Sequence, residues 1–393
     1  MKRYIGTVTR GIRTPIVKTG DDLVEIVTQS MIDAVESENI QFRDKDIVCV
    51  TESLLARTQG NYVTIDQIAK DVANKFPDEI GLVFPILSRN RFAVLLKGIA
   101  ASGRKIHILF GYPSDEVGNH LMDEKTLYDL DINPYSDVLE EEDYRRHFGD
   151  HVAHQFTGID YVSLYKEMAP NCEVHFSNNP KTILNYTKDV IVCSTHTRHL
   201  IKQELKDHGG NIVLGLDNIM NDSIDGSGYN PEFGLLGSNT AGDNKVKLFP
   251  RDNQAFVEAV QEKLQAYSGK SIEVMVYGDG AFKDPVGKIW ELADPVVSPG
   301  YTAGLEGTPN EIKIKYVADT ELNDLSSEEM EAAMLNRINS KDSNLTGKNE
   351  TLGTTPRQIT DLLGSLADLT SGSGDKGTPV VFIQGYFDNY ASI

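Results

Sequence analysis

Residues 272–284 combine a short apolar run with a turn that carries a carboxylate. The apolar run at 272–277 is bounded by turn residues, which is typical of an interior strand. Asp279 follows it between Gly278 and Gly280, and glycines allow a positive φ and a close approach of backbone to ligand. At the carboxyl end of a strand, such a carboxylate could hold a divalent cation and, through it, phosphates. The same pattern also suits a tight turn with a solvated aspartate.

A second candidate site is the turn Ser-Thr-His-Thr-Arg at 194–198. It connects a predicted strand at 189–193 to a predicted helix at 199–207. A turn rich in Ser and Thr at a helix N-terminus suits an anion. We therefore assign phosphate contacts to His196 and to Arg198, whose guanidinium offers several donors. The hydroxyls are equally suited to ordinary helix capping.

Three acidic residues follow the next predicted strand, within a glycine-rich segment: Asp217, Asp222 and Asp225. Their carboxylates are candidate ligands for Mg²⁺ or Mn²⁺. Aspartates are also common turn formers, because their side chains accept hydrogen bonds from the backbone nearby. The sequence leaves both interpretations open.

A histidine-rich segment offers a different metal site. His147, Asp150, His151 and His154 fall at i, i+3, i+4 and i+7, so on one helix they would share a face, as metal binding requires. Gly149 interrupts the segment, and charged segments commonly expose histidines to solvent. The two interpretations are a metal site and a solvated surface.

Composition and charge limit the class of protein. The chain has 393 residues, 40% of them hydrophobic, and a net charge of −20. This acidity argues against nucleic acid or an anionic membrane as the main partner. Three scattered cysteines form neither a disulfide framework nor a zinc site, and no secretory signal or membrane-spanning run is present. We expect a cytoplasmic protein.

The elements that must position these residues alternate between strands and helices, which predicts a mixed α/β or α+β fold. A phosphate-binding P-loop, a nucleophile elbow and a zinc-protease helix motif are all absent from the sequence. We expect a first part at 1–125, an insertion at 126–185, a central part at 186–317, a polar linker with a helix at 318–350, and a returning helix and strand at 351–393.

Several sequence blocks together resemble the coenzyme F-420 gamma-glutamyl ligase family. Residues 16–23 read Ile-Val-Lys-Thr-Gly-Asp-Asp-Leu, and they precede an apolar strand at 47–51 and the loop Leu-Ala-Arg-Thr-Gln-Gly at 55–60. Gly-Ser-Asn follows at 237–239, and the glycine-containing tail at 369–385 completes the order. The added residues at 81–185 are similar to those of a longer bacterial subgroup.

This resemblance implies an intertwined α+β fold with a large insertion, assembled as a homodimer. It also implies joining of L-glutamate to an acceptor with GTP or ATP and with Mg or Mn ions. The chemistry implied is stepwise. A carboxylate attacks the γ-phosphate to give an acyl phosphate, and the amine then displaces phosphate to form an amide.

The sequence departs from the family pattern at its metal ligands. Leu236 stands where the family has an aspartate, and Ser373 stands where it has a glutamate. The family's loop lysine and glutamate are replaced by Arg57 and Gln59. Asp279 lies where the family has an Asp-Thr pair. Either the metal site is rebuilt, with Asp217, Asp222 or Asp225, or ligase activity has been lost.

Our leading hypothesis is an NTP- and metal-dependent amide ligase with an unknown acceptor. In it, Asp279 binds metal, Gly278 and Gly280 allow close backbone approach, and Ser238 and Asn239 contact the nucleotide or support the metal ligands. Arg57 and Arg198 neutralise phosphate or carboxylate charge. Two other hypotheses remain: a non-catalytic protein that binds a nucleotide or phosphorylated metabolite, and a metal enzyme that uses the histidine-rich segment.

Overall fold

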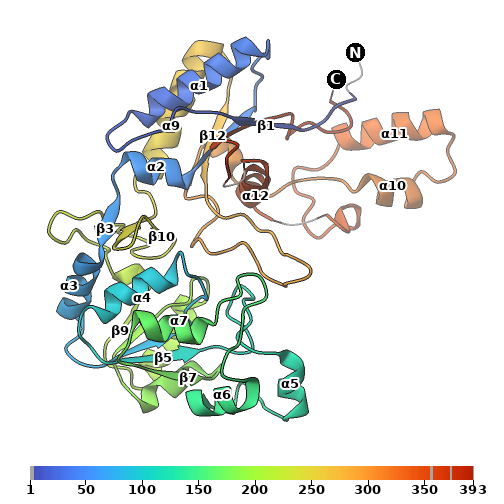
Figure 1. The fold of residues 1–393 in the computed structure, drawn as a ribbon. Helices are drawn as coiled ribbons and strands as arrows, with labels where there is room; N and C mark the ends of the chain where they lie inside the picture. The colour runs from blue at the N-terminus through green and yellow to red at the C-terminus, as the bar shows by residue number, and fades with distance from the viewer. Residues whose placement is uncertain (1–3, 355–356, 372–373, 393) are drawn as a thin grey trace.

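Two lobes, each built on its own β-sheet, make up the molecule, and Figure 1 shows them one above the other. The computed structural model describes residues 4–354, 357–371 and 374–392. The fold is α+β, as the sequence predicts. The strands of the upper lobe come from both ends of the chain and from its middle, whereas the lower lobe is nearly continuous in sequence.

The sheet of the first lobe is five-stranded. Its order is β1 (Val8–Ile12), β14 (Val380–Gln384), β2 (Ile47–Thr51), β12 (Glu273–Tyr277) and β13 (Gly300–Tyr301). Strands β2 and β12 are parallel, and the other neighbours are antiparallel. The last strand along the chain therefore lies between the first two, which makes the lobe intertwined.

Helices cover both faces of this sheet. Helices α1 (Leu23–Ser37) and α9 (Asn253–Ser268) pack on one face, and α12 (Ile359–Ser371) packs on the other. Successive strand residues point to opposite faces, so alternate residues of β2 and β12 enter the two cores. This explains why both strands read as continuous apolar runs in the sequence.

The second lobe contains a six-stranded sheet. Its order is β6 (Leu139–Glu140), β7 (Cys172–Phe176), β5 (Ile106–Phe110), β4 (Ile80–Val83), β8 (Val190–Val192) and β9 (Val213–Gly215), and only β6 is antiparallel to its neighbour. One face is covered by α3 (Ile65–Lys75), α4 (Phe92–Ala100) and α7 (Tyr161–Met168). The other face is covered by the 3-10 helix η1 (Pro180–Asn185) and by α8 (Arg198–Asp207).

The segment expected as an insertion, 126–185, contributes to this sheet. Its strand β7 pairs with β5 along five residues, and β6 pairs with β7. Helices α6 (Glu141–Phe148) and α7 lie between these strands in sequence. The segment therefore supplies one side of a doubly wound sheet that begins with β4 at residue 80.

The remaining elements connect the lobes or lie beside them. A small sheet of β3 (Tyr62–Thr64), β11 (Lys245–Lys247) and β10 (Asn239–Thr240) lies between the lobes. Helices α10 (Ile314–Thr320) and α11 (Ser327–Asn339) form a separate small cluster at the side. The short elements are α2 (Glu52–Thr58), α5 (Glu124–Asp129), η2 (Leu216–Asn218), η3 (Ala303–Leu305) and η4 (Asn349–Thr351).

Among the described residues, every helix is too short or too polar to traverse a lipid bilayer.

Candidate functional site

A cleft of about 960 Å³ lies between the two lobes. The first lobe contributes the carboxyl ends of β2 and β12, together with α12, and the second lobe contributes the loop after β4. A loop at 289–294 closes one side. The cleft therefore collects residues that are far apart in sequence, which a local motif search does not reveal.

Parallel pairing of β2 and β12 places two carboxylates at one edge of the sheet. Thr51 pairs with Tyr277, so the two strands end level with each other. Glu52 follows β2 directly and Asp279 follows β12 by two residues, and both line the cleft. The predicted strand at 272–277 is confirmed within one residue, and Asp279 lies at its carboxyl end as expected.

Two further aspartates hold the turn around Asp279. Asp294 accepts a hydrogen bond from the Asp279 backbone N–H at 2.7 Å, and Asp368 of α12 accepts one from the Gly280 N–H at 3.2 Å. All of these carboxylates line the same cleft.

The two glycines of the turn are needed for close packing. Glycines allow a positive φ, but neither Gly278 nor Gly280 has one. A Cβ on Gly278 would collide with Asp294 Oδ2, and one on Gly280 would lie 2.7 Å from Ser365 Cα. Side-chain and helix atoms of the chain itself therefore occupy the space next to both glycines.

Arg91 joins the two lobes at this point. It precedes α4, and its guanidinium forms ion pairs with Asp279 (Nη2 to Oδ2, 2.7 Å) and Asp294 (Nη1 to Oδ1, 2.8 Å). Burial alone would lower the pKa of Arg91, but Asp294 and Asp279 outweigh burial and hold that pKa above its usual range. Arg91 is therefore a fixed positive charge between carboxylates.

The carboxylates are only partly compensated by this one guanidinium. Burial, followed by repulsion from Asp294, raises the pKa of Glu52 to about 8. The same two causes raise the pKa of Asp279 to about 7, and burial also raises the pKa of Asp368. Oxygen Oε2 of Glu52 is buried without a hydrogen-bond partner in the described part of the chain.

This donor set fits the metal that the sequence led us to expect. All donors are carboxylate oxygens, the ligand type that Mg²⁺ and Mn²⁺ prefer. A cation beside Glu52 and Asp279 would satisfy the orphaned oxygen and relieve the repulsion that raises both pKa values. Glu52, Asp279, Asp294 and Asp368 would supply its carboxylate oxygens, which among the described residues are not yet gathered at the spacing of ligands of one ion.

The sequence profile of the family described as F420-0:Gamma-glutamyl ligase matches residues 11–385. The chain belongs to this family. No curated protein matches the sequence. The family match covers both lobes and every cleft residue named above, so the cleft is part of the ligase-family fold.

Two further candidate residues from the sequence, Arg57 and Asn239, line the cleft. Arg57 does so while its Nε donates to the Val17 carbonyl at 2.7 Å. Asn239 accepts a hydrogen bond from Asn90 at 3.0 Å. Ser238 is buried outside the cleft lining, and its hydroxyl donates to the Leu235 carbonyl at 2.7 Å.

The turn at 194–198 is not part of the cleft lining, and its donors already have an anion. The Glu116 carboxylate accepts hydrogen bonds from the Thr195 and His196 backbone N–H groups and, at 2.9 Å, from the Ser194 hydroxyl. Arg198 lies 3.4 Å from Asp217. The anion-binding character read from this turn is thus met by the chain's own carboxylate.

The three additional aspartates lie outside the cleft lining as well. Asp217 forms ion pairs with Lys202 at 2.9 Å and with the Arg198 guanidinium. Asp225 pairs with Lys70 at 2.7 Å, and Asp222 accepts a hydrogen bond from its neighbour Ser223. The structure does not bring any of them to Asp279; Glu52, Asp294 and Asp368 are there instead.

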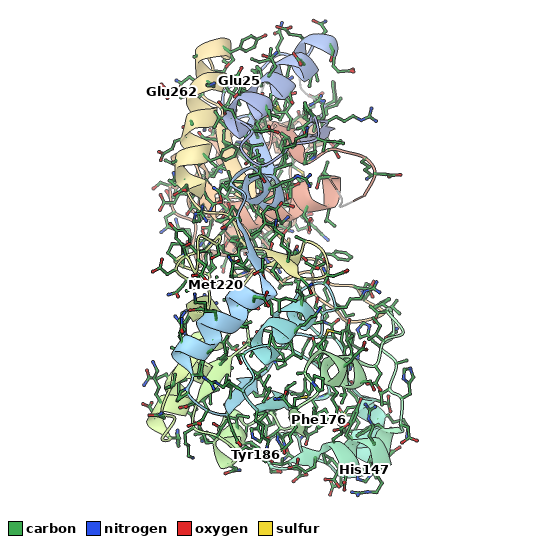
Figure 2. The ribbon with its side chains drawn as sticks, turned by 60° about the vertical axis from the view of Figure 1, so that its left-hand side comes forward. Glu25, His147, Phe176, Tyr186, Met220 and Glu262 are labelled. Atoms are coloured by element: carbon green, nitrogen blue, oxygen red, sulfur yellow. The ribbon has the colours of Figure 1, made fainter. Side chains whose placement is uncertain are left out.

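The histidine-rich segment does not form the helical face that we expected. Helix α6 ends at Phe148, and Gly149 takes a φ of 99°, so the residues after it leave the helix. His154 is buried against Asn119, while His147 lies at the far end of the second lobe (Figure 2). In the described part of the chain these side chains are not gathered at the spacing of metal ligands, so the metal interpretation of this segment is not supported.

Of the two positions at which the sequence departs from the family pattern, the structure describes one. Leu236 is buried in the hydrophobic core of the second lobe and offers no ligand atom. Ser373 lies outside the described residues.

Sequence reasoning missed Glu52, Arg91, Asp294 and Asp368. A signal existed for Glu52, because it follows an apolar strand just as Asp279 nearly does. Arg91 belongs to a basic loop whose contacts depend on how the lobes are placed.

Proposed function

We propose that the chain is an amide-forming ligase that uses a nucleoside triphosphate and Mg²⁺ or Mn²⁺. The observation that carries the proposal is the group of four partly compensated carboxylates beside Arg91 in the interlobe cleft. Membership of a ligase family supports the reaction class. A site of this charge suits a metal–triphosphate complex better than a free anion, because the ion brings the missing positive charge.

The proposed reaction consumes one triphosphate for each amide bond. An acceptor carboxylate oxygen attacks the γ-phosphorus and the bond to the β-phosphate oxygen breaks, leaving a nucleoside diphosphate and an acyl phosphate. The amine of L-glutamate, the amino acid that the family resemblance suggests, then attacks the acyl carbon and phosphate leaves. The metal, when bound, neutralises the phosphate oxygens.

The chain's own residues position the reactants. Arg91 is paired with two of the carboxylates, and Arg57 and Arg89 line the same cleft and offer charge to phosphate or acceptor carboxylate. Asp294 and Asp368 hold the turn that presents Asp279. Their share of catalysis is positioning and charge neutralisation.

Calorimetric titration of GTP and of ATP with Mn²⁺ tests the proposal. We expect one nucleotide to bind wild type. Asp279→Asn should weaken that binding by roughly 1 kcal/mol or more, the scale of a lost charged contact, which is about fivefold in Kd. Asp207→Asn, an exposed aspartate at the end of α8, is the matched control and should bind normally. If neither nucleotide binds wild type, the proposal fails.

A second function is favoured by one specific observation. Arg91 already forms ion pairs with two of the carboxylates, and Leu236 removes a ligand that the family pattern contains. A chain of this kind could bind a nucleotide or phosphorylated metabolite without catalysis. Release of ADP or GDP with L-glutamate and a metabolite extract separates the two functions. Binding without any release supports the non-catalytic one.

We further propose a cytoplasmic homodimer. The family resemblance supports the dimer, and the scattered cysteines suit a reducing compartment. Light scattering of the purified chain measures the first directly; a monomeric mass at micromolar concentration would contradict it.

A further inference from the structure

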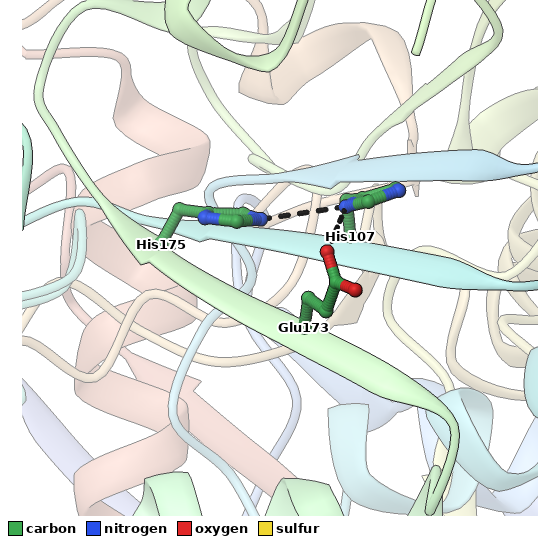
Figure 3. Close-up of side chains that lie close together, drawn as sticks. All are labelled: His107, Glu173 and His175. Carbon is green, nitrogen blue, oxygen red and sulfur yellow. Dashed lines mark hydrogen bonds and ion pairs between the residues drawn. The ribbon is translucent and has the colours of Figure 1, made fainter. Parts of the chain in front are cut away.

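A second group of metal-ligand side chains lies on the sheet of the second lobe, and its residues are separate from those of the cleft. His107 on β5 and Glu173 on β7 are paired in register, and His175 follows two residues along β7. All three side chains therefore project from the same face of the sheet, and Figure 3 shows them converging. Their ligand atoms all lie within 4.8 Å of one another.

Two of the three distances within the group match those between ligands of one tetrahedral ion. His107 Nδ1 lies 3.4 Å from His175 Nε2 and 3.3 Å from Glu173 Oε2. Bonds of about 2.0–2.1 Å to a tetrahedral zinc ion separate its ligand atoms by about 3.3–3.4 Å. An octahedral ion with similar bonds would bring neighbouring ligands to about 3.0 Å.

Each histidine is also held by a carboxylate at its other ring nitrogen. His107 Nε2 lies 3.1 Å from Glu79, and His175 Nδ1 lies 2.6 Å from Glu140. The Glu140 contact places the ring proton of His175 on Nδ1, because carboxylates accept, whereas His107 has a carboxylate at each ring nitrogen, Glu79 at Nε2 and Glu173 at Nδ1. Such outer carboxylates are the usual support of metal-binding histidines, since they fix both the tautomer and the ring orientation.

Metal binding uses the tautomer in which both outer nitrogens carry the ring protons. In that tautomer His107 Nδ1 and His175 Nε2 both point lone pairs at a gap of 3.4 Å. Neither nitrogen then donates to the other, and a positive charge between them, either a metal ion or a proton, removes the repulsion. Both residues are only 3% exposed, so water does not relieve this conflict as it would at a surface.

The surroundings also favour a cation. Three carboxylates surround the two imidazoles, and the nearest basic group, Lys105, pairs with Glu173 at 2.9 Å. Tyr186 stacks on the His175 ring at a centroid distance of 3.7 Å and donates its hydroxyl to Glu140 at 2.6 Å. The Glu173 side chain is 52% exposed, which leaves a route to solvent.

We propose that His107 Nδ1, His175 Nε2 and a Glu173 carboxylate oxygen bind one transition-metal ion of the zinc type, with water at the fourth position. Two imidazoles and one carboxylate favour such an ion over Mg²⁺ or Ca²⁺, which prefer oxygen ligands throughout. The ion joins β5 to β7. Through Glu79 and Glu140, it also fixes the start of β4 and the edge strand β6.

Titration of the metal-free chain with Co²⁺, in excess Mg²⁺ to occupy the oxygen-lined cleft, tests the proposal. We expect one Co²⁺ per chain with the intense visible absorption of a tetrahedral complex, displaced by Zn²⁺. His175→Gln should lower the affinity at least tenfold. Glu140→Gln, which keeps a hydrogen-bond acceptor and the fold, should lower it about 10–100-fold. Binding should also raise Tm.

His208→Gln is the matched control, because His208 is half-exposed after the end of α8, contacts none of the three proposed ligands, and has its Nδ1 2.8 Å from the Glu204 carbonyl oxygen. It should leave the Co²⁺ spectrum and affinity unchanged. Two results overturn the proposal: a wild type that binds no Zn²⁺ at micromolar concentration, and His175→Gln and Glu140→Gln variants that bind Co²⁺ like wild type. The first result would indicate that a shared proton bridges the histidines instead.

Discussion

The surroundings of Asp279 disfavour the charged form of its carboxyl group. Its carboxylate could be found from sequence because it stands between glycines at the end of an apolar strand. Its partners could not, because Glu52, Asp294 and Asp368 reach it only through strand pairing and helix packing. The sequence therefore predicted one carboxylate of the cleft, and the fold brings the others to it.

The stability of the protein should fall as pH rises from about 5 to 8. Glu52 and Asp279 have raised pKa values in the folded chain, to about 8 and about 7. The folded state therefore binds more protons than the unfolded state, whose carboxyl groups titrate near 4. This stabilisation is complete below about pH 4 and is lost as pH passes the folded values.

Urea unfolding at pH 6, 7 and 8 without divalent ions measures this slope. Asp279→Asn removes one of the two titrations. The loss of unfolding free energy between pH 6 and pH 8 should therefore be smaller by at least about 1 kcal/mol, because one pKa unit corresponds to about 1.4 kcal/mol. Asp207→Asn should keep the wild-type slope. Equal slopes for wild type and Asp279→Asn would contradict this account of the cleft.

Helices and strands are predicted correctly where residues close in sequence determine them. The helix predicted at 199–207 is confirmed as α8, and the apolar strands at 47–51 and 272–277 are β2 and β12. The helical face expected from residue 147 onward failed, because the positive φ of Gly149 ends α6. Spacing indicates a shared face only where the backbone continues the helix.

The turn after β12 should not tolerate a larger residue. Gly278→Ala would place a Cβ against Asp294 Oδ2, which holds the Asp279 backbone and pairs with Arg91. We expect a loss of about 1–3 kcal/mol in unfolding free energy, the usual cost of overpacking, together with weaker nucleotide binding. Gly6→Ala, where no atom lies within 4 Å of the added Cβ, is the control for both measurements.

At the scale of the whole molecule, the two lobes differ in how the chain builds them. The second lobe uses a doubly wound order that begins at β4, and its strands follow one another in sequence. The first lobe needs β1 and β14, which are more than 360 residues apart and pair along five positions. Sequence alone indicated the α+β class, but pairing at this separation leaves no local signal.

Removal of the last strand, β14, should unfold the first lobe and leave the second lobe folded. A chain that ends after residue 371 lacks β14, so β1 and β2 lose their shared partner. We expect the unfolding transition of the first lobe to disappear, and nucleotide binding with it. The second lobe should keep its own unfolding transition. A chain that ends after Gly385 retains every β14 pair and should show both transitions in calorimetry. One shared, intact transition in the shorter chain would refute this independence.

The position of β14 also orders events at the ribosome. The second lobe can fold once residue 249, the last buried residue of its core, has left the exit tunnel, well before synthesis ends. The sheet that presents Glu52 and Asp279 has to wait for residues 380–384, the final strand to be made. An interrupted translation product therefore emerges with a finished nascent lobe but without the assembled edge on which the carboxylates meet. Cellular quality control would therefore meet a chain whose second lobe is folded and whose interlobe cleft is not yet assembled.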